Sequence, residues 1–533
     1  MLFHTWTFVL FLALVLPVFL ALRRTRLWLP WLMLASYFFY GWWNPYYLIL
    51  ILYSTALDYV LVALMDHCPP AKTAFPLLKR LLHLDFDDAV LRRAFLVSTA
   101  LTAATAASAL IAPATLRPTL LTLTGILFMM ALGAFLGSRR VWLFVSLVNN
   151  LAILVFFKYA GFFTENLNAL LAAAHVSARL PDPASLMPLG AAYLLPVGIS
   201  FFTFQSMSYT IDFYRGQVRR ERSFIRFATF VSFFPQLVAG PIERARNLLP
   251  QFDNPPEIRI KDVTDGLSLF LVGLFKKLAM ANYLSLYVER VFDNPSAFDA
   301  TSLALATFAF AWQIFFDFSG YTDMARGVAK VMGFNLMLNF NNPYLASGLG
   351  DFWSRWHISL STWFRDYVYI PLGGNRHGSL VTYRNLLIVF LISGIWHGAA
   401  WTFVIWGALH AFGILITREL ERSAFYRERV PRLLKQLATF AFVCFAWIFF
   451  RAASLDDALL IVSRIFTGAW HAPQMPALLL LLVSAIWLYQ FAFESRLQPF
   501  LHTGFVRVTT AVCMILYLCI FASEGGAFIY FQF

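Results

Sequence analysis

The chain opens with MLFHTWTFVLFLALVLPVFLAL (residues 1–22), which is followed at once by Arg23, Arg24 and Arg26. A run of about 20 apolar residues is long enough to cross a bilayer as a helix. The run has no basic region before it and no small-residue cleavage site, so we interpret it as an uncleaved membrane span rather than a signal peptide. Cytoplasmic loops carry an excess of Lys and Arg, and the arginines therefore predict an amino terminus outside the cytoplasm.

The composition of the whole chain extends this interpretation. Of the 533 residues, 60% are apolar and only 13% are charged, whereas soluble domains have about 45–50% and about 25%. Mean hydropathy is +0.68. A soluble globule needs a charged exterior, and a disordered chain has far fewer apolar residues. We therefore predict an all-α polytopic membrane protein with about eleven or twelve transmembrane helices, plus re-entrant and interfacial helices around a central cavity.

The net charge of +13 arises because 41 Lys and Arg residues outnumber 28 Asp and Glu residues. Basic cytoplasmic loops explain this excess better than nucleic-acid binding, since each basic cluster falls where alternating spans predict the cytoplasm. A long loop at 66–93 with mixed charge is expected to carry short surface helices. The spans predicted after the first are 27–42, 46–65, 94–112, 119–137, 141–158, 187–210, 385–415, 432–450, 476–494 and 505–523.

The spans divide the chain into three segments. Residues 1–210 hold amino-terminal transmembrane helices, 211–384 form a central region with re-entrant and amphipathic helices, and 385–533 hold carboxyl-terminal transmembrane helices. The central region contains FFPQLVAGP (233–241), which cannot form a regular lipid-facing helix because proline removes a backbone donor. Residues 311–345 embed charged residues among aromatic ones, and we expect them to be irregular as well.

Several common kinds of catalytic site lack their residues in this chain. The sequence has no glycine-rich phosphate loop with Lys and Ser or Thr, no G-x-S-x-G elbow, and no two histidines spaced four apart. The cysteines show neither disulfide nor metal-ligand spacing, so we predict no metal site. They are Cys68, Cys444, Cys513 and Cys519.

His397 stands in the sequence SGIWHGAAW, within an apolar run that we predict to be one span at 385–415. An ionisable residue at membrane depth is costly and is a functional candidate by default, and burial favours the neutral imidazole that a general base needs. Gly394 and Gly398 remove neighbouring side chains, so a substrate could approach, and Trp401 at i+4 could wall the imidazole. The alternative is a histidine that hydrogen-bonds a neighbouring helix.

His357 stands in DFWSRWHISLSTWFRDY (351–367), which we place on one amphipathic helix at an interface or cavity wall. Asp351 and Arg355 could form an i,i+4 ion pair. His357 lies at the flank of the apolar face, and spacing alone leaves open whether it points into a cavity or is structural. The polar face is predicted to carry Arg355, Ser359, Thr362 and Asp366.

His410 is the third histidine in an apolar context. It lies thirteen residues beyond His397, which is about 220° around one continuous helix. The two histidines could not share a face there, so we interpret His410 as structural. The other histidines stand in loops or at span ends, where a solvated or interfacial role is expected.

These residues carry a resemblance to a known family. The chain is similar to bacterial members of the membrane-bound O-acyltransferase family, and more narrowly to the alginate O-acetyltransferase branch, which includes peptidoglycan O-acetylation and teichoic-acid D-alanylation proteins. The order and identity of so many stretches make the resemblance specific, although the last part of the chain adds only generic spans. The matching stretches are SYFFYGWW (36–43), FKY (157–159), LPVGISFFTFQ (195–205), DFYR (212–215), PQLVAGPI (235–242), DFSGYTD (317–323), NFNNPY (339–344), WHISLS (356–361) and WHG (396–398).

The resemblance implies a ring of tilted helices around a thin, cavity-bearing centre, with His397 as the catalytic histidine and His357 as the second polar residue of the active site. Acetyl-CoA or another acyl thioester, free or on an acyl carrier, is implied as the donor substrate from the cytoplasmic side, and no bound cofactor is expected. The acetyl group is implied to pass to an extracytoplasmic acetyltransferase partner protein and then to a polysaccharide, at the bacterial cytoplasmic (inner) membrane. Substrate-binding residues expected near the histidines are Asn339, Tyr344, Asp317, Ser319, Tyr321, Gln205 and Trp401.

Two alternatives stay open at this point. One is D-alanyl transfer to teichoic acid from a carrier protein. The other is a transporter or channel that moves an acyl donor or a glycan without catalysis. A transporter is expected to show paired intramembrane charges and an inverted repeat, and neither is evident in the sequence.

Overall fold

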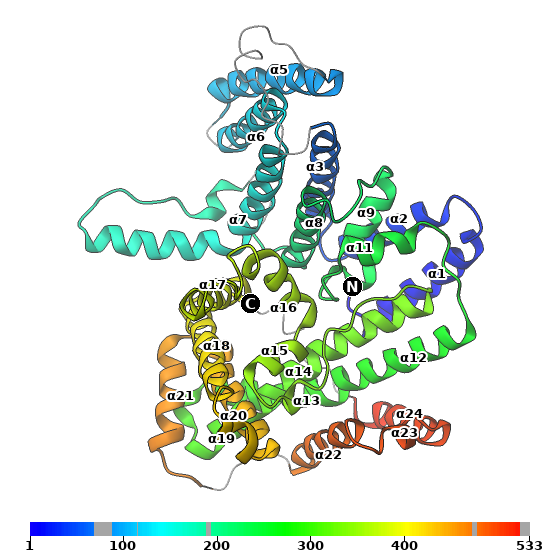
Figure 1. Ribbon diagram of the computed structural model, residues 1–533, viewed down its shortest axis with the longest axis vertical. Coiled ribbons are helices and arrows are strands. Elements are labelled where there is room, and N and C mark those ends of the chain that lie inside the picture. The colour runs from blue at the N-terminus through cyan, green and yellow to red at the C-terminus, as the bar shows by residue number, and fades with distance from the viewer. Residues whose placement is uncertain (69–87, 114–115, 188–192, 472–476, 523–533) are drawn as a thin grey trace. The chain divides into compact units, whose positions relative to one another are not determined.

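The structure is a computed structural model that describes residues 1–68, 88–113, 116–187, 193–471 and 477–522. The described residues fold into helices and connecting segments without a strand (Figure 1). They form two compact units. Unit 1 comprises Met1, Val15–Val238 and Glu243–Pro255, and unit 2 comprises Leu2–Leu14, Ala239–Ile242 and Pro256–Phe533.

These units do not coincide with the three segments predicted from the sequence, because each unit joins stretches that are distant in sequence. Helix α1 (Trp6–Leu22) contributes residues to both units. The helices of unit 1 are α2 (Trp28–Gly41), η1 (Pro45–Tyr47), α3 (Leu48–Asp66), α5 (Ala89–Ile111), α6 (Arg117–Leu136), α7 (Arg139–Ala173), η2 (Pro183–Leu186), α8 (Ile199–Tyr214), α9 (Phe224–Ser232), α10 (Phe234–Leu237), α11 (Ala245–Leu248) and η3 (Leu249–Phe252).

Unit 2 holds the remaining helices. They are α12 (Ile260–Phe275), the π-helical η4 (Lys276–Ala281), α13 (Asn282–Phe292), η5 (Pro295–Ala297), α14 (Ala300–Val331), η6 (Pro343–Leu345), α15 (Leu349–Arg355), α16 (Ile358–Phe364), the π-helical η7 (Arg365–Tyr369), α17 (Ser379–His397), α18 (Trp401–Leu420), α19 (Ala424–Arg429), α20 (Arg432–Arg451), α21 (Leu455–Thr467), α22 (Ala477–Phe493), α23 (Gln498–Leu501) and α24 (Gly504–Phe521).

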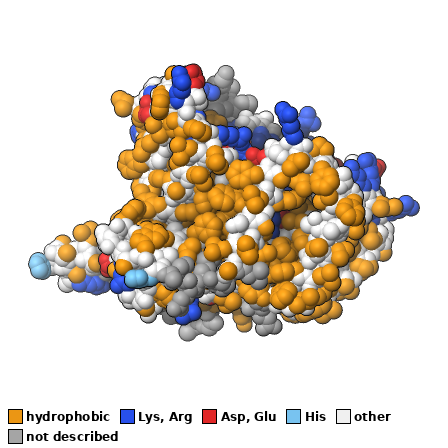
Figure 2. Space-filling view, turned by 90° about the horizontal axis from the view of Figure 1, so that it is seen from below, with side chains coloured by type: hydrophobic (Ala, Val, Ile, Leu, Met, Phe, Trp, Pro, Cys, Tyr) orange, Lys and Arg blue, Asp and Glu red, His pale blue; other side chains and the backbone are white. Residues whose placement is uncertain are grey.

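The predicted class of an all-α polytopic membrane protein is confirmed. Within the described ranges, ten helices are long and apolar enough to cross a membrane, and Trp6–Leu22 and Leu480–Phe493 are shorter apolar helices. Large apolar side chains on these helices are exposed, and apolar side chains cover much of the face in Figure 2. Lipid is the solvent that accommodates such a surface. The short surface helices expected at 66–93 fall largely on residues outside the described ranges.

The run predicted as one span at 385–415 is two helices. Helix α17 ends at His397, Gly398 and Ala400 are extended, and α18 begins at Trp401. The two helices pack against each other in antiparallel directions, with Gly394 against the backbone of Phe403 and Gly407 against that of Phe390. The prediction of a single span was therefore wrong, and His397 lies at a helix end.

Two glycines allow this close pairing. A Cβ on Gly394 would lie 2.3 Å from the carbonyl oxygen of Phe403, and a Cβ on Gly407 would lie 2.4 Å from that of Phe390. A Cβ on Gly398 would collide with the ring of Phe403. Gly394 and Gly398 therefore make room for α18, not for a substrate as the sequence suggested.

The expected irregularity of residues 311–345 is also only partly correct. Residues up to Val331 belong to the regular 32-residue helix α14, and the chain becomes irregular only after it. Helix α12 packs against α14 backbone to backbone, since a Cβ on Gly273 would lie 2.5 Å from the carbonyl oxygen of Gly320. A Cβ on Gly266, seven residues before Gly273, would lie 2.7 Å from the carbonyl oxygen of Gly327, seven residues after Gly320.

Charged residues on α14 are paired across this contact. Lys277 Nζ lies 2.7 Å from Asp317 Oδ1, and both side chains are 4% exposed. Lys276 Nζ lies 2.6 Å from Asp323 Oδ2. The expectation that paired charges are absent from the membrane-spanning helices is therefore wrong. The partners are forty or more residues apart in sequence, so spacing within one helix did not reveal them.

Unit 1 is held by a different polar contact. The buried carboxyl group of Asp58 on α3 accepts hydrogen bonds from Ser146 Oγ (2.6 Å) and Asn150 Nδ2 (2.9 Å) on α7, and from Ser206 Oγ on α8. One side chain thus ties three helices together. All its partners are neutral, so hydrogen bonds rather than an ion pair satisfy this carboxyl group.

Candidate active site

His397 is the last residue of α17 and is 6% exposed. Aromatic rings surround its imidazole at centroid distances of 4.8 Å for Trp396, 5.1 Å for Trp406 and 5.2 Å for Phe450. All three contacts are edge-to-face, with interplanar angles between 68° and 82°. The imidazole is thus largely sheltered from solvent at the carboxyl end of a helix.

The prediction that Trp401 lies against this imidazole was wrong. Trp401 is 56% exposed and begins α18 after the chain has reversed, so it is not one helical turn beyond His397. Trp406, five residues further along α18, takes that place. The error follows directly from reading 385–415 as one helix.

His357 lies at a corner between two short helices. Helix α15 ends at Arg355 and α16 begins at Ile358, so the single amphipathic helix predicted for 351–367 is wrong. His357 itself has a φ of +43°, in the left-handed region that non-glycine residues rarely adopt. Such conformations cost free energy and cluster at functional sites. The break also buries Ser359, which the helix pattern had placed on the polar face.

Asn339 fixes the residues around this corner. The backbone oxygen of Asn339 accepts a hydrogen bond from the Ile358 N–H at 2.9 Å. Its side-chain oxygen accepts from the Ser359 N–H at 3.2 Å and from Ser359 Oγ at 2.9 Å. Asn339 therefore satisfies donors in the first turn of α16, which places it in a supporting role for His357.

Trp396 is the residue that relates the two histidines. Its ring centroid lies 4.8 Å from that of His397 and 6.2 Å from that of His357. The two imidazoles are therefore no farther apart than the sum of these distances. Trp396 was not predicted as a site residue, although its place directly before His397 in the WHG stretch was a usable signal.

The environment of His357 determines its protonation. The side chain is 0% exposed, and the ring of Phe318 on α14 lies 4.7 Å away in an edge-to-face contact. Burial lowers the pKa of His357 to about 3, from an ordinary value of 6.5. Near neutral pH this imidazole is therefore uncharged and has one donor and one acceptor nitrogen.

Other predicted site residues lie in unit 2 with defined contacts of their own. Tyr344 donates its hydroxyl hydrogen bond to the backbone oxygen of Ala311. Asp317 is the partner of Lys277. Ser319 and Tyr321 are buried on α14. Tyr344 and Asp317 thus support the fold around the site, and a direct role in binding substrate stays a prediction for all four.

Gln205 differs because it belongs to unit 1. Its Nε2 donates to the backbone oxygen of Phe230, which also accepts from Gln236 Nε2 at 2.9 Å. Gln205 on α8 and Gln236 on α10 thus both donate to the backbone carbonyl group of Phe230 on α9. This contact gives Gln205 a structural role inside its own unit.

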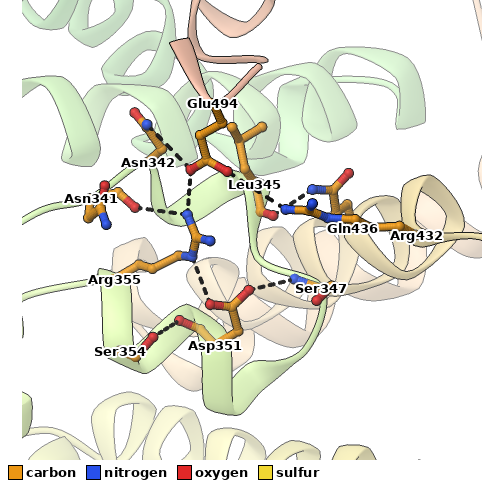
Figure 3. A network of polar contacts seen from close by, with 10 residues as sticks. All are labelled: Asn341, Asn342, Leu345, Ser347, Asp351, Ser354, Arg355, Arg432, Gln436 and Glu494. Atoms are coloured by element: carbon orange, nitrogen blue, oxygen red, sulfur yellow. Dashed lines mark hydrogen bonds and ion pairs between the residues drawn. The ribbon is translucent and has the colours of Figure 1, made fainter. Parts of the chain in front are cut away.

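An ionic network flanks the His357 corner (Figure 3). Arg355 Nε lies 2.7 Å from Asp351 Oδ1, which confirms the predicted i,i+4 pair. Arg355 Nη1 also lies 2.5 Å from Glu494 Oε1, just beyond the end of α22. Asp351 in turn accepts from the Ser347 N–H at 3.1 Å. The segment before His357 is therefore held at several points.

His410 lies on α18 in an aromatic enclosure. The ring centroids of Trp406 and Trp353 lie 4.8 and 5.0 Å away, and the side chain is 0% exposed. Neither ring nitrogen has a hydrogen-bond partner among the described residues. His397 and His410 contact the same Trp406 from different helices, so the argument that excluded a shared location was wrong. Within the described ranges, no group of three or more His, Cys, Asp or Glu side chains could hold a metal ion.

Comparisons with known proteins place the chain in a family. The sequence model of MBOAT, the membrane-bound O-acyltransferase family, matches residues 97–455, which is more than half of the chain. A protein of Azotobacter vinelandii named probable alginate O-acetylase AlgI is 41% identical over 343 residues. The match covers 64% of this chain and 66% of that protein, just under two thirds of its length.

Two further relatives extend the comparison. A peptidoglycan O-acetyltransferase of Helicobacter pylori is 34% identical over 453 residues, covering 74% of this chain and 83% of that protein. A teichoic acid D-alanyltransferase of Bacillus subtilis is 29% identical over 272 residues, covering 48% of this chain and 68% of that protein. From the family match and these relatives, we conclude that the chain belongs to the membrane-bound O-acyltransferase family.

Proposed function

We propose that the protein transfers an acetyl group from a cytoplasmic thioester, such as acetyl-CoA or an acyl carrier, for O-acetylation of an extracytoplasmic polysaccharide. The observation that supports this most is the contact of Trp396 with both His397 and His357 in a sheltered aromatic setting. The names of the more similar relatives point to alginate-like polysaccharide or peptidoglycan as the acceptor. The proposed location is the bacterial inner membrane, with the amino terminus outside.

His397 is proposed as the general base. A ring nitrogen of His397 takes the proton of the acceptor hydroxyl while the hydroxyl oxygen attacks the carbonyl carbon of the thioester. The carbon–sulfur bond then breaks. The proton passes from the imidazole to the leaving thiolate. His397 ends α17, and the negative carboxyl end of a helix favours the positive charge that the imidazole carries between these steps.

His357 is proposed as the residue that orients the acceptor or stabilises the oxyanion. A neutral imidazole donates one hydrogen bond, which suits either task without placing a full charge in the site. The enclosure by aromatic side chains limits the access of water, and so limits hydrolysis of the thioester. An extracytoplasmic acetyltransferase partner that receives the acetyl group belongs to the same proposal.

The test replaces His397 with Ala in the full chain and measures labelled acetyl incorporated into cell-envelope polysaccharide. We expect incorporation to fall to background while the protein accumulates normally in the membrane. His410→Phe is the matched control, since it removes a buried histidine on the neighbouring helix. Normal acetylation by the His397→Ala protein would refute the assignment.

The alternatives are separated by the same assay with purified protein. D-alanyl transfer is less supported, because the D-alanyltransferase relative has the lowest identity and the smallest coverage of this chain among the three relatives described above. The pairs Lys277–Asp317 and Lys276–Asp323 are the kind of intramembrane charge that a transporter would carry. A transporter would move the labelled donor without forming an O-acetyl ester, whereas the proposed enzyme forms the ester only with His397 present.

A further inference from the structure

We propose that Glu494 is a positioning residue, which acts through Arg355 to fix the corner between α15 and α16 where His357 lies. The proposal rests on the role of His357 proposed above. Glu494 lies beyond residue 455, where the family match ends. The sequence pattern of that region predicted only a generic span.

The first support is the way Arg355 is joined to the chain around it. Its backbone oxygen accepts a hydrogen bond from the Asn341 N–H at 2.9 Å, and its Nη1 donates to the Asn341 oxygen at 3.4 Å. Arg355 precedes His357 by two residues. A displacement of Arg355 would therefore move both chain segments that meet at the corner.

The second support is the geometry at Glu494, drawn in Figure 3. Its Oε1 lies 2.5 Å from Arg355 Nη1 and accepts from Asn342 Nδ2 at 3.5 Å, while its Oε2 lies 3.7 Å from Arg432 Nη2. The Arg355 and Glu494 side chains are only 18% and 24% exposed. Charge-assisted hydrogen bonds that are partly shielded from water hold geometry better than fully exposed pairs.

The third support is backbone strain at the two ends of the supported segment. Asn342 and His357 both have φ values of +43°. Residues in the left-handed region persist only where the surroundings hold them there. Glu494 contacts Asn342 directly and reaches the neighbourhood of His357 through Arg355. It is therefore placed to stabilise both strained residues at once.

The experiment compares Glu494→Gln with the unchanged full-length protein in lipid nanodiscs. We expect kcat for labelled acetyl transfer to fall about tenfold, because small misplacements of catalytic groups are costly, with KM for acetyl-CoA changed less than about twofold. Hydrogen–deuterium exchange is expected to rise at residues 339–361 and nowhere else. Glu494→Asp keeps the charge and is expected to recover most of the lost kcat.

Asp293→Asn is the matched control, because it removes a carboxylate partner from Arg451 at 3.2 Å, away from the network drawn in Figure 3. It is expected to leave both kcat and the exchange at 339–361 unchanged. Unaltered exchange at 339–361 in Glu494→Gln, or an unaltered kcat, would each overturn the proposal. Activity of the His397→Ala protein would instead refute the proposed function, whatever Glu494 does.

Discussion

The side-chain oxygen of Asn339 accepts two hydrogen bonds from Ser359, one from the backbone N–H at 3.2 Å and one from Oγ at 2.9 Å. The two residues are twenty positions apart in sequence. The contact joins the irregular segment after α14 to the first turn of α16, directly beside His357. Integrity of the corner at His357 therefore depends on a residue outside both of its helices.

Replacing Asn339 with Ala should remove this cap. We expect the free energy of unfolding to fall by about 1–2 kcal/mol and acetyl transfer to fall about tenfold, because buried donors lose their acceptor and His357 loses its support. Asn339→Asp retains an acceptor oxygen and should keep most of the activity. Denaturant unfolding in detergent micelles and acetyl incorporation are the two measurements. Full activity in Asn339→Ala would show that the cap is dispensable.

The neutral state of His357 predicts a pH dependence of stability. The folded pKa of about 3 lies below the unfolded value of 6.5, so the unfolded chain binds a proton that the folded chain does not. This contribution to stability is complete above pH 6.5 and declines by about 1.4 kcal/mol per pH unit as pH falls toward 3. His357→Asn tolerates the left-handed backbone and removes the titrating group.

The measurement is the free energy of unfolding of both proteins at pH 7.5 and at pH 5. The unchanged protein should lose about 2 kcal/mol more than His357→Asn between these values. Equal losses would mean that His357 is not the group responsible. His357→Asn should also lose acetyl transfer at pH 7.5, since the carboxamide does not reproduce the imidazole.

The contact between α17 and α18 predicts a strong effect of one added methyl group. Gly394→Ala would place a Cβ 2.3 Å from a backbone oxygen, which cannot move aside cheaply. We expect the helices to separate locally, with a loss of about 1–3 kcal/mol from overpacking and a fall in activity at the adjacent His397. Gly350→Ala is the control, because a Cβ there meets nothing within 4 Å. Thermal unfolding of the two variants in the same detergent distinguishes them.

The buried pair Lys277–Asp317 predicts non-additive substitutions. Asp317→Asn or Lys277→Met alone leaves an uncompensated charge and should cost about 3–5 kcal/mol, whereas the double variant should cost much less than the sum. Unfolding free energies of all four proteins form the required cycle. Additive losses would show that the two side chains do not depend on each other.

The apolar pattern was sufficient to predict several of the long helices, but it predicted no span at Ile260–Phe292 or Ala300–Val331. The span predicted at 432–450 is α20, Arg432–Arg451, almost to the residue. The reversal after His397 was missed because it uses Gly398 and two alanines inside an apolar run, without proline or polar residues to mark a turn. Such a turn is visible only once the helices pack, since the glycines that permit it also occur in continuous membrane helices.

The candidate site was predicted in its two histidines but not in its supports. His397 and His357 follow from motifs of a few adjacent residues. Trp406 reaches His397 only because the chain reverses between the two residues, and Glu494 contacts Arg355 from 139 positions further along the chain. The strained backbone of His357 was also beyond prediction, because the local pattern around it favours one continuous helix.

The ion pair between Arg355 and Glu494 bears on any attempt to make a minimal version of this enzyme. Trimming the chain at residue 455, where the match to the family model ends, would discard the only acidic side chain that reaches this arginine from outside its own helix among the described residues. The end of the family match and the end of the region that we propose to hold His357 in place therefore differ. A shortened protein would retain both histidines but would lack the carboxylate that contacts Arg355.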